Sequence, residues 1–221
     1  MKKVSDEKTA EISRRLIEHY GRYDETRGNP FDVLVATILS QNTTDRNSHR
    51  AFASLYEAYD SPEKLAIAPE EKIADLIRIG GLQEQKARLI KEVARLVVEE
   101  YGGSLDFVCE ADPEAARKEL LSIRGVGPKT ADCVLLFSCG RDVIPVDTHV
   151  FRITKRLGIV PEKADHEAAR EILMEKVPAG ERGSVHVALI RFGKEICTAR
   201  NPGHDQCFLI DLCDYARQLG I

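Results

Sequence analysis

The stretch Leu121–Asp132, which reads LSIRGVGPKTAD, decides the fold. A helical pattern enters it from about Pro113, and an apolar helical pattern leaves it toward Phe137. Gly125 and Gly127 stand between the two patterns, where glycine permits a tight turn and leaves backbone N–H groups uncovered. The stretch therefore predicts two helices joined by a short hairpin.

The start of the second helix combines features that suit DNA chemistry. Pro128 fits its first position, where the missing N–H costs nothing, and the exposed amides there form an anion site for a DNA phosphate. Lys129 follows, and the positive end of a helix disfavours its ammonium form. Desolvation by bound DNA acts in the same direction and yields a neutral amine, a nucleophile that forms Schiff bases. A plain helix corner with a solvated lysine is the alternative.

Helical spacing continues through the rest of the chain, without period-2 alternation. Two segments place apolar residues on one face: Ile12, Leu16, Ile17 and Tyr20 in one, and Ala87, Ile90, Ala94, Val97 and Val98 in the other. Glycines such as Gly102 and Gly158 stop helices, and Pro30, Pro62, Pro113, Pro128, Pro161 and Pro178 mark breaks or first turns. These patterns predict an all-α protein of about ten helices, with a boundary near residues 140–145.

Composition is that of a soluble protein, with 43% hydrophobic and 31% charged residues. No apolar run approaches the about 20 residues of a membrane span, and the charged N-terminal residues argue against an export signal. A cytoplasmic location is expected, nucleoid-associated in a prokaryote. The net charge of −4 neither supports nor excludes DNA, because phosphate contacts depend on local fields. No disulfide framework is expected, and Cys109, Cys133 and Cys139 are expected to be chemically inactive.

Four segments resemble the endonuclease III family of DNA glycosylases. Residues 121–131 resemble its helix–hairpin–helix, and residues 145–152, PVDTHVFR, resemble its Gly/Pro-Asp loop. Residues 38–45, ILSQNTTD, resemble its glutamine-bearing helix end, and residues 81–87, GLQEQKA, resemble its wedge loop. The resemblance runs in order from about residue 30 to Cys213.

The resemblance implies a role for each matching residue. Lys129 would attack C1′ of an everted nucleotide and expel the base, and Asp147 would stabilise the developing sugar cation. Taken from the residues alone, Asp147 is equally the N-cap of the helix that follows it. Gln41 would fill the gap left by the extruded base and Leu82 would wedge beside it, the alternatives being a helix-end glutamine and a packing leucine. The other expected DNA contacts are Gly125, Val126, Gly127, Thr130, His149 and Arg152.

A metal site is expected in the C-terminal segment. Cys197-x6-His204-x2-Cys207-x5-Cys213 keeps the spacing of the four cysteines that bind a [4Fe–4S] cluster in this family, with His204 in place of the second cysteine. The resemblance favours a [4Fe–4S] cluster with these four ligands. A structural Cys₃His zinc site and a site without metal remain open. A bound metal would tie the last turns of the chain together.

The resemblance also implies an architecture and an activity. Residues 28–140 would form a helical barrel domain, and residues 1–27 with 141–221 a second helical domain carrying the cluster loop, with the active site in the cleft between them. The expected enzyme is a monomer that excises oxidised or damaged pyrimidines from double-stranded DNA and cleaves the abasic site by β-elimination, because the family's adenine- and thymine-removing relatives lack the lysine. The alternatives are a monofunctional uracil or thymine mismatch glycosylase and a non-catalytic DNA-binding scaffold. No membrane partner is expected.

Overall fold

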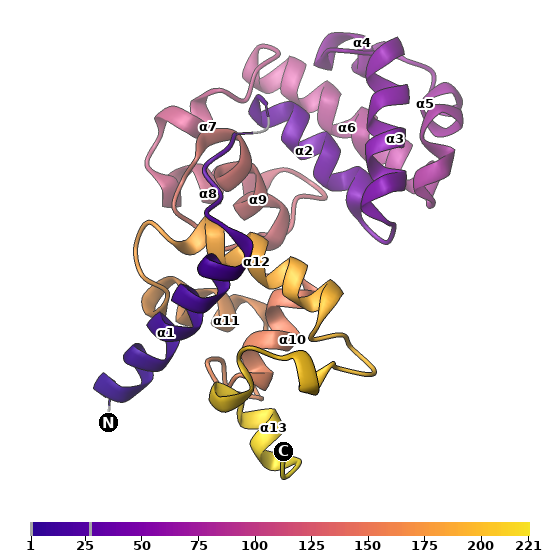
Figure 1. The fold of residues 1–221 in the computed structure, drawn as a ribbon. Coiled ribbons are helices and arrows are strands. Elements are labelled where there is room, and N and C mark those ends of the chain that lie inside the picture. The colour runs from indigo at the N-terminus through magenta and orange to yellow at the C-terminus, as the bar shows by residue number, and fades with distance from the viewer. Residues whose placement is uncertain (1, 27) are drawn as a thin grey trace. The chain divides into compact units, whose positions relative to one another are not determined.

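The computed structural model describes residues 2–26 and 28–221. All regular structure in these ranges is helical, with thirteen α-helices, three 3₁₀-helices and no strand (Figure 1). The all-α prediction is therefore confirmed. More than about ten helices are found because α4 (Pro62–Ile67), α7 (Phe107–Glu110) and α13 (Asp214–Gln218) have only six, four and five residues. Helices this short carry too few apolar positions to show a helical period.

The chain divides into two compact units, residues 26–140 and residues 1–25 with 141–221. Besides α4 and α7, the first unit contains α2 (Pro30–Ser40), α3 (Asp45–Ala58), α5 (Glu70–Ile77), η1 (Arg78–Gly80), α6 (Gln83–Tyr101), α8 (Pro113–Ser122) and α9 (Pro128–Cys139). The most apolar of these, α2, packs against α3, α6 and α9. Helix α6 also packs against α4 and α5, which buries its apolar face at Ala87, Ile90, Ala94 and Val97.

The second unit joins both ends of the chain. Besides α13, it contains α1 (Lys2–Tyr20), α10 (Thr148–Arg156), α11 (His166–Lys176), α12 (Arg182–Glu195), η2 (His204–Gln206) and η3 (Ile210–Leu212). Helix α12 packs against α1 and α10 around a core that includes Ile12, Leu16, Val150, Ile153 and Phe192. Arg15 of α1 donates to Asp211 at 2.7 Å and to the carbonyl of Phe208 at 3.0 Å, which ties the first helix to the C-terminal segment.

Local sequence signals explain where many helices begin. Proline occupies the first turn of α2, α4, α8 and α9, and Pro161 and Pro178 lie in breaks between helices, as predicted. Side-chain oxygens of the N-cap residues accept backbone N–H groups of the first turn, which satisfies donors that have no partner within the helix. These N-caps are Asn29, Thr44, Ser61, Asp112, Asp147 and Asp165.

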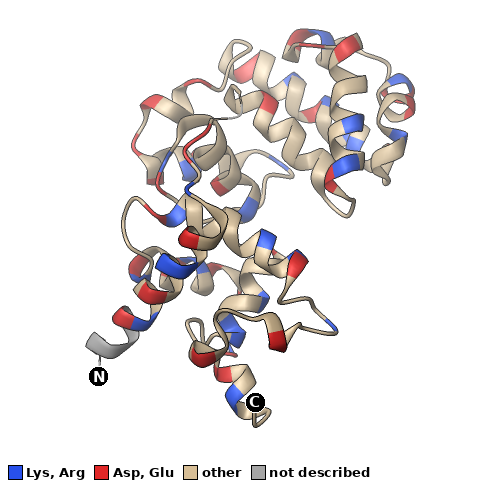
Figure 2. Cartoon of the chain, viewed as in Figure 1, with Lys and Arg blue, Asp and Glu red and all other residues tan. Residues whose placement is uncertain are grey.

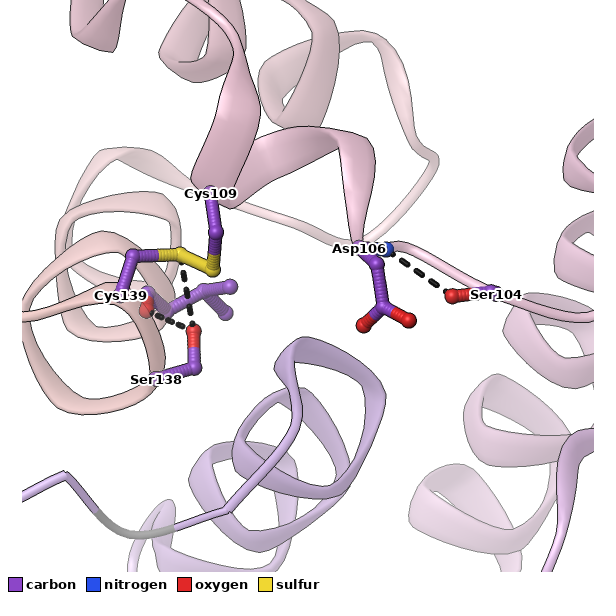
Figure 3. The surroundings of a disulfide bond; sticks show 6 residues. Ser104, Asp106, Cys109, Ser138 and Cys139 are labelled. Atoms are coloured by element: carbon purple, nitrogen blue, oxygen red, sulfur yellow. Dashed lines mark hydrogen bonds between the residues drawn. A yellow bond between two sulfur atoms is a disulfide. The ribbon is translucent and has the colours of Figure 1, made fainter.

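A disulfide joins Cys109 of α7 to Cys139 at the end of α9 (Figure 3). The sequence-based expectation that these cysteines play no chemical role is therefore wrong. The two residues lie 30 positions apart, and the packing of α7 against α9 brings their Cα atoms within 5.0 Å. Such packing leaves no mark in local sequence spacing. Cys133 is a buried thiol in the apolar face of α9, in keeping with the expected packing role.

Charged residues of both signs are interspersed along the helices of each unit (Figure 2). This mixture accompanies the small net charge of −4. Within the described ranges, no helix combines the length and the apolar character needed to cross a membrane.

Candidate functional site

The predicted hairpin joins α8 to α9 in the first unit. The amide of Val126 donates to the carbonyl of Ile123 at 3.0 Å and closes the turn. Gly125 has a φ of +84°, and a Cβ there would collide with the side chain of Leu89. Gly127 instead has an extended backbone, with φ −91° and ψ 173°, and a Cβ there would meet nothing within 4 Å. The turn geometry therefore requires glycine at 125, whereas Gly127 leaves open space beside the start of α9.

Lys129 lies in the first turn of α9, directly after Pro128, and is half-buried. No described residue forms a hydrogen bond or an ion pair with its amine. The N-cap residue Gly127 supplies no side-chain bond to the helix start, so the first amides of α9 remain available to an external acceptor. The side chains of Val126 and Thr130 are buried, which leaves only their main chain for contact with a ligand.

A buried ion pair supports this helix behind Lys129. Arg117 Nε of α8 lies 3.0 Å from Asp132 Oδ1 of α9, and the two residues are 7% and 1% exposed. Sequence reasoning missed this pair, because two charged residues fifteen positions apart give no signal that they meet in a core. It locks α8 against α9 one turn after Lys129.

Asp147 is the N-cap of α10 in the second unit. Its Oδ1 accepts the amide of Val150 at 2.8 Å, so the capping interpretation is confirmed. This bond fixes the carboxylate, and no described residue binds its Oδ2. An orientation fixed in this way is compatible with a catalytic role, because a preorganised charge acts without reorganisation.

His149 and Arg152 follow on α10 and pack against α12. Arg152 Nη2 donates to the carbonyl of Cys197 at 2.9 Å and lies 3.3 Å from His149 Nδ1. Burial lowers the pKa of Arg152. A Cβ at Gly193 of α12 would lie only 2.6 Å from His149 Nδ1, so glycine permits this close packing. The structure thus uses Arg152 to join α10 to the start of the cysteine segment.

Gln41 and Leu82 both belong to the first unit. Gln41 is the exposed C-cap residue of α2, and Leu82 is a 45% exposed leucine that opens α6. Leu82 has a φ of 53°, and Asn42, next to Gln41, has a φ of 54°. Among the described residues, these two are the only non-glycine residues with positive φ. Strained backbone therefore marks both expected DNA-intercalating loops.

The four expected metal ligands line one cavity in the second unit. Its walls include Cys197, His204, Cys207 and Cys213. Arg156 Nη1 lies 3.3 Å from Cys197 Sγ. Burial raises the pKa of the Cys207 thiol, and the neighbouring Cys197 and Cys213 add to the effect. Metal coordination would relieve this cost, because a metal-bound thiolate is stabilised by the positive ion.

The donor atoms around this cavity are of the types that bind iron–sulfur clusters in proteins. Three sulfurs and one imidazole surround a volume, and in the described ranges no three His, Cys, Asp or Glu side chains stand at the spacing of a single-ion site. A tetrahedral zinc holds its ligand atoms about 2.0–2.3 Å from one centre. An iron–sulfur cluster uses thiolates on separate iron atoms, which places the ligands farther apart.

The chain matches known proteins along most of its length. Residues 35–179 match the family of HhH-GPD superfamily base excision DNA repair proteins, and residues 197–213 match the iron–sulfur binding domain of endonuclease III. Endonuclease III of Thermotoga maritima is 38% identical over 211 residues, covering 95% of this chain and 94% of that protein.

Solved structures of DNA repair proteins share this fold. An endonuclease III trapped as a covalent intermediate with DNA, in an estranged-adenine complex, matches with a TM-score of 0.83 and 30% identity over 95% of each chain. A thermostable thymine-DNA glycosylase matches with a TM-score of 0.82 and 26% identity, covering 98% of this chain and 99% of that one. The protein therefore belongs to the endonuclease III family of DNA glycosylases and AP lyases, within the HhH-GPD superfamily of base excision DNA repair proteins.

Proposed function

We propose that the protein removes oxidised or otherwise damaged pyrimidines from double-stranded DNA and then cleaves the abasic strand. The observation that carries this proposal is Lys129, an amine in the first turn of α9 that no described residue engages. A lysine amine that no ion pair holds is accessible to an electrophilic carbon, and lysine amines form Schiff bases. The solved endonuclease III–DNA covalent intermediate supports covalent chemistry in this family.

The proposed reaction begins with the eversion of the damaged nucleotide. The lone pair of Lys129 Nζ attacks C1′, the C1′–N bond to the base breaks, and the base leaves with the bonding electrons and takes up a proton. The amine then loses a proton, the C1′–O4′ bond of the sugar breaks and O4′ takes up a proton, which leaves a Schiff base between Nζ and C1′. Loss of a C2′ proton then drives β-elimination, which breaks the bond between C3′ and its oxygen and cuts the strand on the 3′ side. Asp147 stabilises the positive charge that develops on the sugar.

The DNA contacts that we propose divide into two groups. The start of α9 receives a phosphate through the amides of Gly125, Gly127 and Thr130. Val126, whose amide closes the turn, shapes this site. His149 and Arg152 of α10 contribute polar groups beside Asp147. Gln41 and Leu82 occupy the gap that the everted nucleotide leaves, which offsets the few kcal/mol that unstacking costs.

We also propose that Cys197, His204, Cys207 and Cys213 hold a [4Fe–4S] cluster. The matching iron–sulfur binding domain and the shared cavity support this ligand set. When bound, the cluster would cross-link the C-terminal segment, adding to the hydrogen bonds that Arg15, Arg152 and Arg156 already make to it. Iron and sulfide analysis with visible absorbance distinguishes this cluster from zinc and from a metal-free site.

A second candidate function is removal of uracil or thymine from mismatches with guanine. The likeness to the thymine-DNA glycosylase favours it. Separate assays of base release and strand cleavage on thymine glycol and G·T duplexes test the two. Strand cleavage on thymine glycol that is lost in Lys129→Ala supports the bifunctional enzyme. Base release from G·T without cleavage supports the mismatch enzyme, and DNA binding without either reaction supports a scaffold.

A further inference from the structure

Lys86 is the most deeply buried lysine of the described chain, with 4% of its surface exposed. It lies in the first two turns of α6, four residues after Leu82. Burial lowers the pKa of its amine. A buried ammonium lowers the free energy of unfolding unless acceptors satisfy its N–H groups. The hydrogen bonds of Lys86 therefore show which parts of the structure it stabilises.

The ammonium of Lys86 donates to two main-chain carbonyls from different segments. Nζ lies 2.9 Å from the carbonyl oxygen of Leu39, two residues before Gln41, and 3.0 Å from that of Gly80, two residues before Leu82. Charged hydrogen bonds of this kind are stronger than neutral ones. The side chain of Lys86 therefore links the end of α2 to the end of η1.

The local backbone needs this support. Each segment continues directly into a non-glycine residue with positive φ, Asn42 in one and Leu82 in the other. Leu82 is the N-cap residue of α6 and supplies no side-chain hydrogen bond to the first turn. Left-handed conformations of such residues persist where the surroundings enforce them. The two bonds from Lys86 fasten the chain on the inner side of both strained turns.

We infer that Lys86 is a positioning residue that couples the Gln41 loop (residues 39–43) to the Leu82 loop (residues 80–84). The two loops then enter the DNA gap as one rigid unit. The inference rests on the proposed function, since it takes the gap-filling roles of Gln41 and Leu82 from it. Lys86 itself touches no DNA. Its contribution is preorganisation, because loops that are already fixed lose less freedom when they intercalate.

The test compares Lys86→Met with a matched control on the same helix. Methionine keeps the length and apolar stem of lysine and removes the donors. Lys91 of α6 likewise donates to one carbonyl, that of Ala68 at 2.5 Å, but holds neither loop, so Lys91→Met is the control. Affinities are measured for an undamaged duplex and for a duplex with a tetrahydrofuran abasic-site analogue.

Lys86→Met is expected to lose about tenfold in affinity for the abasic duplex, the scale of one or two hydrogen bonds, while binding to undamaged DNA stays unchanged. Lys91→Met is expected to match the wild type on both. Adding Leu82→Ala to Lys86→Met should cost little more than the larger single effect, because both remove the same wedge. Equal losses on both duplexes, an equal loss in Lys91→Met, or full additivity would overturn the inference. So would a wild-type protein without preference for the abasic duplex.

A measurement on the wild type tests the coupling even if Lys86→Met fails to fold. Amide exchange in residues 39–43 and 80–84 should respond identically to low denaturant, because one tie holds both segments. Distinct responses contradict the coupling. Failure of the proposed chemistry is recognised separately: if the wild type cleaves no damaged DNA while Lys86→Met still loses abasic-site preference, the reaction is refuted and the coupling stands.

Discussion

Arg117 and Asp132 form a buried ion pair, 3.0 Å between Nε and Oδ1, one helical turn behind Lys129. Removing one partner of such a pair leaves the other charge in the core without this counter-charge, which costs about 3–5 kcal/mol. We predict that Asp132→Ala lowers the free energy of unfolding by this amount, measured by denaturant titration. The control is Asp60→Ala, which breaks the exposed pair with Lys64 and should cost less than about 1 kcal/mol. Similar losses in the two variants would contradict the buried pair.

The Cys109–Cys139 disulfide encloses α8, the hairpin and α9 in one loop. A cross-link across 30 residues stabilises a protein by about 3–4 kcal/mol, because it restricts the conformational freedom of the unfolded chain. We predict that a mild reductant lowers the melting temperature of the wild type. The double variant Cys109→Ser, Cys139→Ser should melt at the lower temperature whether or not reductant is present. An unreduced wild type with six titratable thiols in the metal-free protein would show that the bond does not form.

Substitutions at the two hairpin glycines are predicted to have different effects, one on protein stability and the other on DNA binding. Gly125→Ala should destabilise the protein, because φ is +84° and the new Cβ collides with Leu89. Gly127→Ala should leave the melting temperature unchanged, since its backbone is extended and the space beside it is open. It should weaken binding to duplex DNA by about tenfold if a phosphate approaches the amides there. Unchanged affinity in Gly127→Ala would argue against a phosphate at this helix start.

His204 is predicted to bind the cluster, and a cysteine at this position is predicted to bind it as well. His204→Cys should retain iron and sulfide and lower the reduction potential, because a thiolate adds negative charge to the cluster. His204→Ala should lose iron on purification. Asp205→Ala, next to it in the exposed part of η2, is the control and should retain iron. Full iron content in His204→Ala would remove His204 from the ligand set.

Features that depend on neighbouring residues could be predicted from the sequence. Pro128 at the start of α9 and the cap formed by Asp147 are both set by residues within a single turn, and both are confirmed. The all-α class followed from apolar spacing in long segments such as residues 83–101. The domain limits predicted at residues 28–140 and the catalytic roles stay predictions.

Contacts between residues far apart in the chain could not be predicted from the sequence. Lys86 in the sequence is one more lysine in a charged helix, and only packing shows that its amine reaches Leu39. The disulfide depends on the short helix α7 meeting the end of α9. Each of these contacts is fixed by tertiary structure rather than by spacing, so no periodicity or cap motif announces it.

The proposed reaction requires a bond between the amine of Lys129 and C1′ of the everted nucleotide. Borohydride reduction during the reaction with an abasic-site duplex, followed by digestion and mass spectrometry, tests it most directly. We expect one stable adduct, located on Lys129 and absent in Lys129→Ala. An adduct on another residue, or strand cleavage with no trapped adduct, would contradict it.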